Sequence, residues 1–306
     1  MHKLDKRVGI FIIIAFGISW LTALVIYLTG GLVDSRELIS GTGITVAIVL
    51  LSTLYMWGPA AANLLTRRVT GQGWQNMMLR PAIKKNWKYW LVAWFGTAGL
   101  TLVGTVIYFL LFPNHFDPSL SVLKDQMEAA GVLTENINLS AIILIQTAAA
   151  IFYAPVLNAL PTFGEEFGWR AYLLPQLAEF GKRKALLLSG VFWGIWHWPV
   201  ILMGHNYGLE YIGYPFTGLA VMVWFTLTVG IFFGWLSHKS GSVWPAVIAH
   251  GALNGIAGIG LLFVRSGFSP LLGPSPAGLV GGIPFTIAAA LILLLAKEDE
   301  NVLSAD

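Results

Sequence analysis

Residues 9–29 read GIFIIIAFGISWLTALVIYLT, an apolar run without a single charge. A helix that crosses the hydrocarbon core of a bilayer needs roughly 20 such residues. The basic stretch MHKLDKR precedes this run, as it would in a secretory signal peptide. The run is longer than a signal-peptide core and no small-x-small cleavage site follows it. The sequence therefore predicts a retained first transmembrane helix.

Seven further apolar segments of similar length follow along the chain, at 43–65, 89–112, 140–162, 186–203, 216–236, 242–263 and 278–296. Of the 306 residues, 56% are hydrophobic and 11% are charged, whereas about 25% are charged in an average soluble domain. This pattern predicts an all-α fold: a polytopic membrane helix bundle of about eight transmembrane helices. No linker divides it, so we expect one integral-membrane domain over residues 1–306.

The basic residues predict the orientation of the bundle. With a cytoplasmic N-terminus, only Arg36, Lys124 and Arg265 fall in outer loops; Arg170 lies within the membrane, and the other 14 of the 18 Lys and Arg residues fall on the inner side. Such asymmetry places both termini in the cytoplasm under the positive-inside rule. The expected location is the cytoplasmic membrane, with the lipid bilayer as a partner. The net charge of +3 comes from short loops, which does not indicate nucleic-acid binding.

Charged residues also occur where hydrocarbon disfavours them, in GEEFGWRAYLLP (164–175). The other thirteen acidic residues fall in loops or tails. Each intramembrane charge costs at least about 2.5–3.5 kcal/mol on insertion scales, and such residues usually mark a function or a buried pair. Glu166 and Arg170 are spaced as an i,i+4 ion pair. Glu165 lies about 100° around the helix from Glu166 and is left without a local partner.

Few other polar side chains occur in the apolar segments. His197 and His250 lie inside them, and Asn254 follows His250 by one helical turn, on the same face. Pro199 is expected to kink the helix just after His197. The remaining histidines, among them His205, are assigned to termini or loops.

Glycine pairs at four-residue spacing lie beside these polar groups, at 164/168, 190/194, 230/234 and 251/255. Such pairs let membrane helices approach closely. We therefore expect the fourth, fifth and seventh segments to meet, with the sixth packed among them. This arrangement would gather Glu165, Glu166, His197, His250 and Asn254 around one cavity that opens toward the cytoplasm.

A carboxylate and an imidazole that face one water can remove its proton, while a second imidazole and an amide stabilise a developing oxyanion. Those groups suffice to hydrolyse an amide bond without a covalent intermediate. The absence of cysteine excludes a thiol nucleophile and thiolate metal sites. No GxSxG, HExxH or phosphate-binding P-loop motif is present, so serine, zincin and nucleotide chemistry have no support.

The stretches EEFGWR (165–170), WGIWH (193–197) and HGALN (250–254) resemble the EExxxR, FxxxH and HxxxN motifs of the CPBP intramembrane proteases, the family of the Rce1-type CAAX endopeptidases. The resemblance covers residues 140–260 and implies a catalytic core there. Trp193 stands where the family motif has Phe, an exchange expected to affect the substrate groove more than the chemistry.

The resemblance implies a role for each matched residue. Glu165 would be the general base, assisted by His197, and His250 and Asn254 would form the oxyanion hole. Glu166 and Arg170 would complete the first motif as a supporting ion pair. Family members are often labelled metalloproteases, and Zn²⁺ held by Glu165, Glu166, His197 and His250 is the alternative. We favour a metal-free mechanism without a cofactor, because Asn254 suits an oxyanion better than zinc.

The implied function is an intramembrane endopeptidase that acts on a membrane-anchored peptide or protein. Two alternatives come from other classes. An ion- or proton-coupled membrane transporter would also carry intramembrane Glu and His residues, but no inverted repeat is visible and the charges gather at one face. A catalytically silent membrane scaffold or immunity protein is the other.

Overall fold

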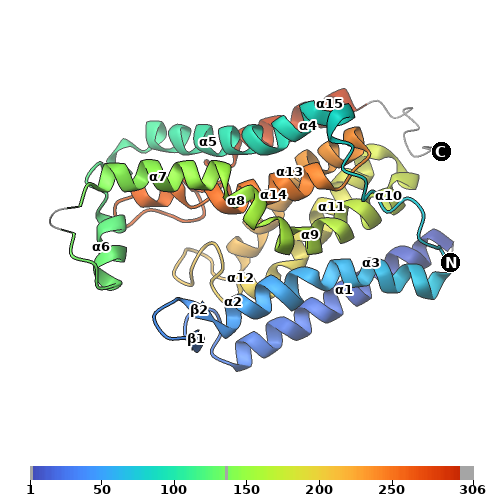
Figure 1. Ribbon diagram of the computed structural model, residues 1–306, viewed down its shortest axis with the longest axis horizontal. Helices are drawn as coiled ribbons and strands as arrows, with labels where there is room; N and C mark the ends of the chain where they lie inside the picture. The colour runs from blue at the N-terminus through green and yellow to red at the C-terminus, as the bar shows by residue number, and fades with distance from the viewer. Residues whose placement is uncertain (1–2, 135–136, 297–306) are drawn as a thin grey trace.

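The computed structural model describes residues 3–134 and 137–296, and it shows an elongated bundle of helices (Figure 1). The elements of its first half are α1 (Lys3–Leu28), β1 (Glu37–Ile39), β2 (Ile44–Thr45), α2 (Val46–Leu50), α3 (Met56–Thr70), α4 (Ile83–Leu91), α5 (Thr97–Leu111) and α6 (Ser121–Ala129). Those of its second half are α7 (Leu139–Phe152), α8 (Ala154–Leu157), α9 (Ala159–Gly168), α10 (Leu174–Leu177), α11 (Lys182–Trp196), α12 (Trp198–Ile201), α13 (Phe216–Ser240), α14 (Trp244–Ile256) and α15 (Ile283–Leu295).

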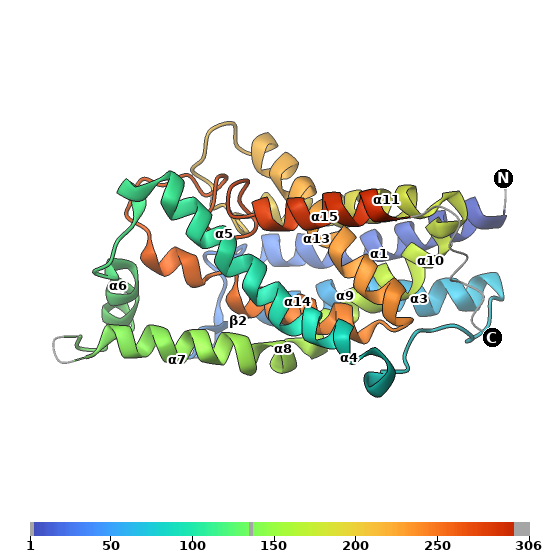
Figure 2. The same cartoon turned by 90° about the horizontal axis from the view of Figure 1, so that it is seen from above.

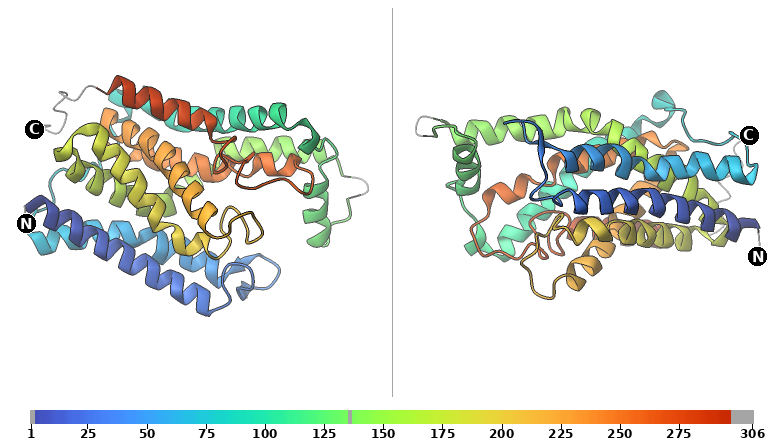
Figure 3. Two further views of the ribbon diagram at one scale, coloured as in Figure 1. Left: turned by 180° about the vertical axis from the view of Figure 1, so that it is seen from behind. Right: turned by 90° about the horizontal axis from the view of Figure 1, so that it is seen from below.

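The longer helices run along the long axis of the molecule. α1 and α3 lie side by side on one face, and α5 and α15 lie together on the opposite face (Figure 3). α1 begins and α15 ends at the same end of the bundle, whereas α6 and the small antiparallel hairpin β1–β2 lie toward the other end (Figures 1 and 2). The hairpin was not predicted; its strands are too short to show the alternation of a buried strand.

Five helical stretches in the described residues are long and apolar enough to cross a membrane: Lys6–Leu28, Val46–Thr70, Ile83–Leu111, Phe216–Ser240 and Trp244–Phe263. Two shorter apolar helices are α7 and α15. The chain is therefore an integral membrane protein with a polytopic helical fold, as predicted. The predicted number of about eight spans stays a prediction, because the fourth, fifth and eighth segments form shorter helices.

The predicted segment 140–162 is not one helix. It divides into α7, α8 and the start of α9, with breaks at Tyr153 and Asn158. Pro155 stands in the first turn of α8, and proline removes a backbone donor and clashes with the carbonyl four residues earlier, which ends a continuous helix. Both glutamates consequently lie inside α9 and not at the end of a long span. The segment 186–203 breaks between α11 and α12 at His197, as Pro199 predicted.

The glycine pairs permit close packing, but only in part between the helices that were expected. A methyl group added at Gly164 would lie 2.7 Å from the Met56 carbonyl oxygen, so α9 packs on α3. One added at Gly190 would lie 2.7 Å from Leu227 Cα, where α11 meets α13. At Gly251 the neighbour is the Pro155 carbonyl oxygen, 2.6 Å away, on α8.

The polar segments meet through other contacts. α9 touches α14, while α13 touches both α11 and α14 and so joins the fifth segment to the seventh. The expectation that the sixth segment packs among the others is confirmed. The expected meeting of the fourth and seventh segments is also confirmed, because Gly251 packs against Pro155, which lies in the fourth segment. The glycine pair of the fifth segment, 190/194, packs on the sixth segment instead.

The bundle provides a direct test of the predicted orientation. Residue 75 lies between α3 and α4, at the end where α1 begins, and residue 125 lies in α6, toward the other end (Figure 1). Reporter fusions at these two positions should give opposite compartment signals, with residue 75 cytoplasmic. Equal signals would contradict the topology, and a cytoplasmic signal from residue 125 alone would reverse it.

Candidate active site

The adjacent glutamates of α9 are both removed from solvent. Glu165 is 2% exposed and Glu166 is fully buried. After Gly168 the helix continues as a π-helical turn, Trp169–Leu173, which carries Arg170. Single π turns inside α-helices are frequent at functional sites. Buried charges persist only when other groups compensate them, and the structure gives the two glutamates different partners.

Glu166 is held on both of its oxygens. Arg170 Nε lies 3.1 Å from Oε2, with both side chains buried, and His250 Nδ1 lies 2.8 Å from Oε1. The predicted Glu166–Arg170 pair is confirmed. The contact with His250 was not predicted, because it joins residues 84 positions apart on α9 and α14.

The bond to Glu166 determines what His250 can do. An ionised carboxylate only accepts hydrogen bonds, so the His250 Nδ1 carries the hydrogen. Its Nε2 can then donate to another group only when the ring is doubly protonated. When both glutamates are ionised and His250 is doubly protonated, the positive charges of Arg170 and His250 balance the two negative charges. The four side chains together then carry no net charge. That state is suited to stabilise a developing negative charge.

Glu165 finds its partner on a different helix. Its Oε2 accepts a hydrogen bond of 2.7 Å from the indole Nε1 of Trp193, on α11. No hydrogen bond to its Oε1 occurs among the described residues. The Arg170 guanidinium carbon lies 4.3 Å from the centre of the same indole ring, a cation–π contact. Trp193, which stands where the resembled motif has Phe, thus contacts both Glu165 and Arg170. The expectation that this exchange affects the substrate groove more than the chemistry stays a prediction.

His197 is oriented by the helix that precedes it. It stands at the junction of α11 and α12, and its Nδ1 lies 2.8 Å from the carbonyl oxygen of Trp193. A carbonyl can only accept, so Nδ1 carries the hydrogen and Nε2 of the neutral ring has a free lone pair. His197 can therefore accept a hydrogen bond or a proton from water at Nε2.

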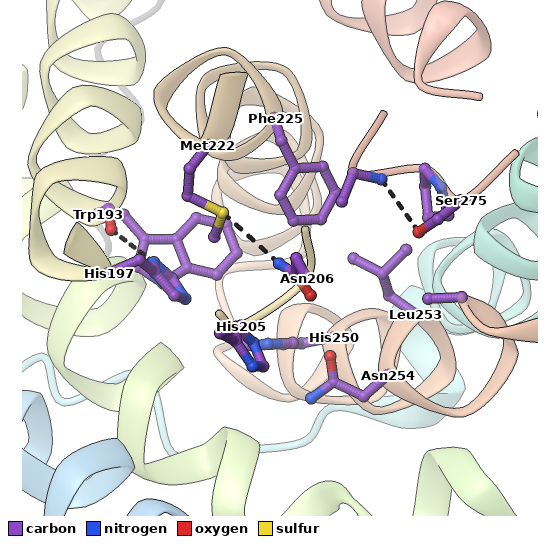
Figure 4. A pocket seen from close by; sticks show the side chains of 13 residues that line it. Trp193, His197, His205, Asn206, Met222, Phe225, His250, Leu253, Asn254 and Ser275 are labelled. Atoms are coloured by element: carbon purple, nitrogen blue, oxygen red, sulfur yellow. Dashed lines mark hydrogen bonds between the residues drawn. The ribbon is translucent and has the colours of Figure 1, made fainter. Parts of the chain in front are cut away.

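A small pocket of about 80 Å³ lies beside this cluster, which is room for a few water molecules. His197, His250 and Asn254 line it, and Asn254 presents an exposed side chain there (Figure 4). The predicted gathering of five residues around one cavity is therefore only partly right. Glu165 and Glu166 do not line the pocket; they lie next to it, bonded to Trp193 and His250, which do.

Two neighbouring polar residues that line the pocket were not among the candidates predicted from the sequence. His205 and Asn206 come from the connection after α12 and line the pocket together with His250 and Asn254 (Figure 4). Asn206 adopts a positive φ of 65°, which is uncommon outside glycine and favoured in Asn. No pattern marks a loop histidine as a pocket residue, so only the fold of this connection reveals it.

A second, larger cavity of about 1360 Å³ lies at the end of the bundle where α1 begins. Its wall includes Arg170, Leu174 and Leu186, and also Leu291 of α15. The first pocket is bordered instead by residues 205–206 and 275–277, which follow α12 and precede α15. The Glu–Arg–His cluster thus has a cavity on each side. The predicted cytoplasmic opening stays a prediction, and under the predicted orientation the larger cavity is the one at the cytoplasmic end.

Zinc does not fit this arrangement. Catalytic zinc usually takes three protein ligands together with a water. Within the described residues, no group of three or more His, Asp or Glu side chains could hold a metal ion. Of the four ligands proposed for the alternative, Glu166 already binds Arg170 and His250, and Glu165 binds Trp193.

These features define a polytopic membrane protein with a buried Glu–Arg–His cluster beside a small pocket that Asn254 lines. Residues 142–256 match the family described as type II CAAX prenyl endopeptidase Rce1-like. This part of the chain therefore resembles the Rce1-like members of the CPBP family. It runs from α7 to the end of α14 and contains every predicted site residue.

A curated relative supports the same assignment. The chain is 33% identical over 114 residues to a protein of Methanococcus maripaludis named CAAX prenyl protease 2. The match covers 33% of this chain and 39% of that relative. This chain therefore covers well under two thirds of that relative's length.

Proposed function

We propose that this protein is an intramembrane endopeptidase that hydrolyses a peptide bond of a membrane-anchored protein or peptide, with water activated by Glu165 and His197. The observation that carries the proposal is the single connected cluster of Glu165, Glu166, His197 and His250 inside the Rce1-like region. Asn254 lies one turn beyond His250 and lines the same pocket.

The proposed reaction begins with a water held between Glu165 Oε1 and His197 Nε2, at the edge of the pocket that His197 lines. Glu165 takes a proton from this water through Oε1, and His197 Nε2 orients it. The resulting hydroxide adds to the carbonyl carbon of the scissile bond. His250 Nε2–H and the Asn254 amide donate hydrogen bonds to the oxyanion of the tetrahedral intermediate. The carbon–nitrogen bond then breaks, and the proton held by Glu165 passes to the leaving nitrogen.

Glu166 and Arg170 have a supporting role in this proposal. Glu166 fixes the His250 ring through Nδ1, and Arg170 neutralises Glu166. Neither needs to touch the substrate. The proposed mechanism uses no metal.

We further propose that the protein is one integral-membrane domain in the cytoplasmic membrane and that substrate reaches the site from the cytoplasmic end. The larger cavity supports this route because it reaches Arg170 from that end. The name of the relative makes a prenylated C-terminal peptide the first probe to use.

Cleavage by purified protein tests the function and the metal together. The protein is chelated extensively, checked by metal analysis, and incubated with a farnesylated CAAX peptide and with a randomised library of lipid-anchored peptides. We expect mass spectrometry to find new peptide ends, formed at the same rate before and after chelation. Activity that is lost and restored only by Zn²⁺ would contradict the metal-free mechanism. Absence of cleavage in both probes by well-folded protein would contradict the protease assignment and favour a transporter or scaffold.

A further inference from the structure

Trp193 makes three separate contacts with the proposed machinery. Its indole Nε1 donates to Glu165 Oε2 at 2.7 Å, and its carbonyl oxygen accepts from His197 Nδ1 at 2.8 Å. Its ring lies beneath the guanidinium of Arg170. One side chain and its backbone therefore connect the proposed base, its assisting imidazole and the neutralising cation.

The indole N–H is the contact that depends on side-chain identity. Any residue at position 193 offers a carbonyl to His197, and any aromatic ring offers a face to Arg170. Phenylalanine would also fit a buried site of this kind, but its side chain has no hydrogen-bond donor for Glu165. The motif that this stretch resembles has Phe here, so the hydrogen bond is a property of this chain.

Burial makes this hydrogen bond consequential. Trp193 is 1% exposed and Glu165 is 2% exposed, so bulk water does not replace a lost donor. Hydrogen bonds to an ionised carboxylate are roughly twice as strong as those between neutral groups. Within the described residues, the indole is the one hydrogen-bond donor to Glu165. The orientation of its carboxylate thus depends on Trp193.

We infer that Trp193 is a positioning residue, which fixes Oε2 of Glu165 through its indole N–H so that Oε1 is presented to the attacking water beside His197. This inference rests on the proposed function and adds to it a residue that the motif does not assign. It acts through Glu165 and does not touch the substrate carbonyl. Its loss should therefore lower kcat and leave KM nearly unchanged.

The test compares Trp193→Phe with Trp169→Phe. Trp169 is also fully buried, and its Nε1 has no hydrogen-bond partner in the described part of the chain. Both substitutions remove the same volume from the interior. Losing a hydrogen bond to a buried charged group corresponds to about 10–100-fold in rate. We expect kcat to fall by that factor in Trp193→Phe only, with similar thermal melting for both variants.

A spectroscopic measurement tests the hydrogen bond without relying on activity. In protein labelled with ¹⁵N-indole tryptophan, the signal missing from Trp193→Phe identifies Nε1–H of Trp193. That signal should shift in Glu165→Gln, where a neutral amide replaces the carboxylate. A signal unmoved by Glu165→Gln, or a Trp193→Phe protein with wild-type kcat, would overturn the positioning role. Wild-type protein that cleaves no peptide would overturn the proposed function instead.

Discussion

Glu165→Gln is expected to abolish peptide cleavage while the protein stays folded. Glutamine has the same size and can still accept the hydrogen bond from Trp193, but it cannot take the proton of the attacking water. General acid–base catalysis contributes about 10²–10⁴-fold to rate, so kcat should fall by at least that much. Cleavage of a lipid-anchored peptide and thermal melting in detergent measure the two parts of this prediction.

The control for this variant is Glu210→Gln. Glu210 is exposed and lines neither the pocket nor the larger cavity, so the same chemical change there should leave kcat unaltered. Near-normal cleavage by Glu165→Gln would show that the general base is misassigned and would make Glu166 the leading candidate. His197→Ala should resemble Glu165→Gln because both residues serve one step. The double variant should then be little worse than either single one.

Arg170→Ala is expected to destabilise the protein strongly. The substitution leaves Glu166, which is fully buried, without its cationic partner. Breaking a buried ion pair by removing one member costs about 3–5 kcal/mol, because the other charge stays buried and uncompensated. We expect a lower yield of folded protein and a clearly lower melting temperature in detergent.

An exposed pair of the same spacing provides a matched control. Lys124 and Glu128 of α6 also form an i,i+4 ion pair, and their side chains are 52% and 50% exposed. Exposed pairs contribute about 0–1 kcal/mol, so Lys124→Ala should melt almost like wild type. Adding Glu166→Gln to Arg170→Ala should restore part of the lost stability, because it removes the stranded charge. An Arg170→Ala protein that melts like wild type yet cleaves nothing would show that Arg170 is catalytic and not supporting.

Local patterns in the sequence were enough to identify the class of fold and the residues to examine. Apolar runs of spanning length, such as 9–29, follow from local composition alone, because a bilayer rewards every apolar side chain independently of its neighbours. The Glu166–Arg170 pair was predictable for a related reason: four residues on one helix fix the distance between them. The helix break at His197 followed equally locally, from Pro199.

Contacts between side chains on different helices could not be predicted from such local patterns. Glu165 had no local partner, and its partner Trp193 lies 28 residues further along on another helix. The same holds for the bond of His250 to Glu166 and for the place of His205 in the pocket. The glycine pairs predicted close packing, but a glycine lets a helix approach without specifying which helix approaches. The pair at 164/168 accordingly packs on α3, which the sequence did not indicate.

The role open to each polar residue therefore depends on how the helices pack. Their packing placed both glutamates beside the pocket and not in its lining, and it turned Nε2 of His197 and His250 into the nitrogens available for chemistry. The apolar segments could be predicted because hydropathy is a property of single residues and short segments. Hydrogen-bond geometry in a dry interior depends on the relative positions of α9, α11 and α14, which only the packing of the whole bundle sets.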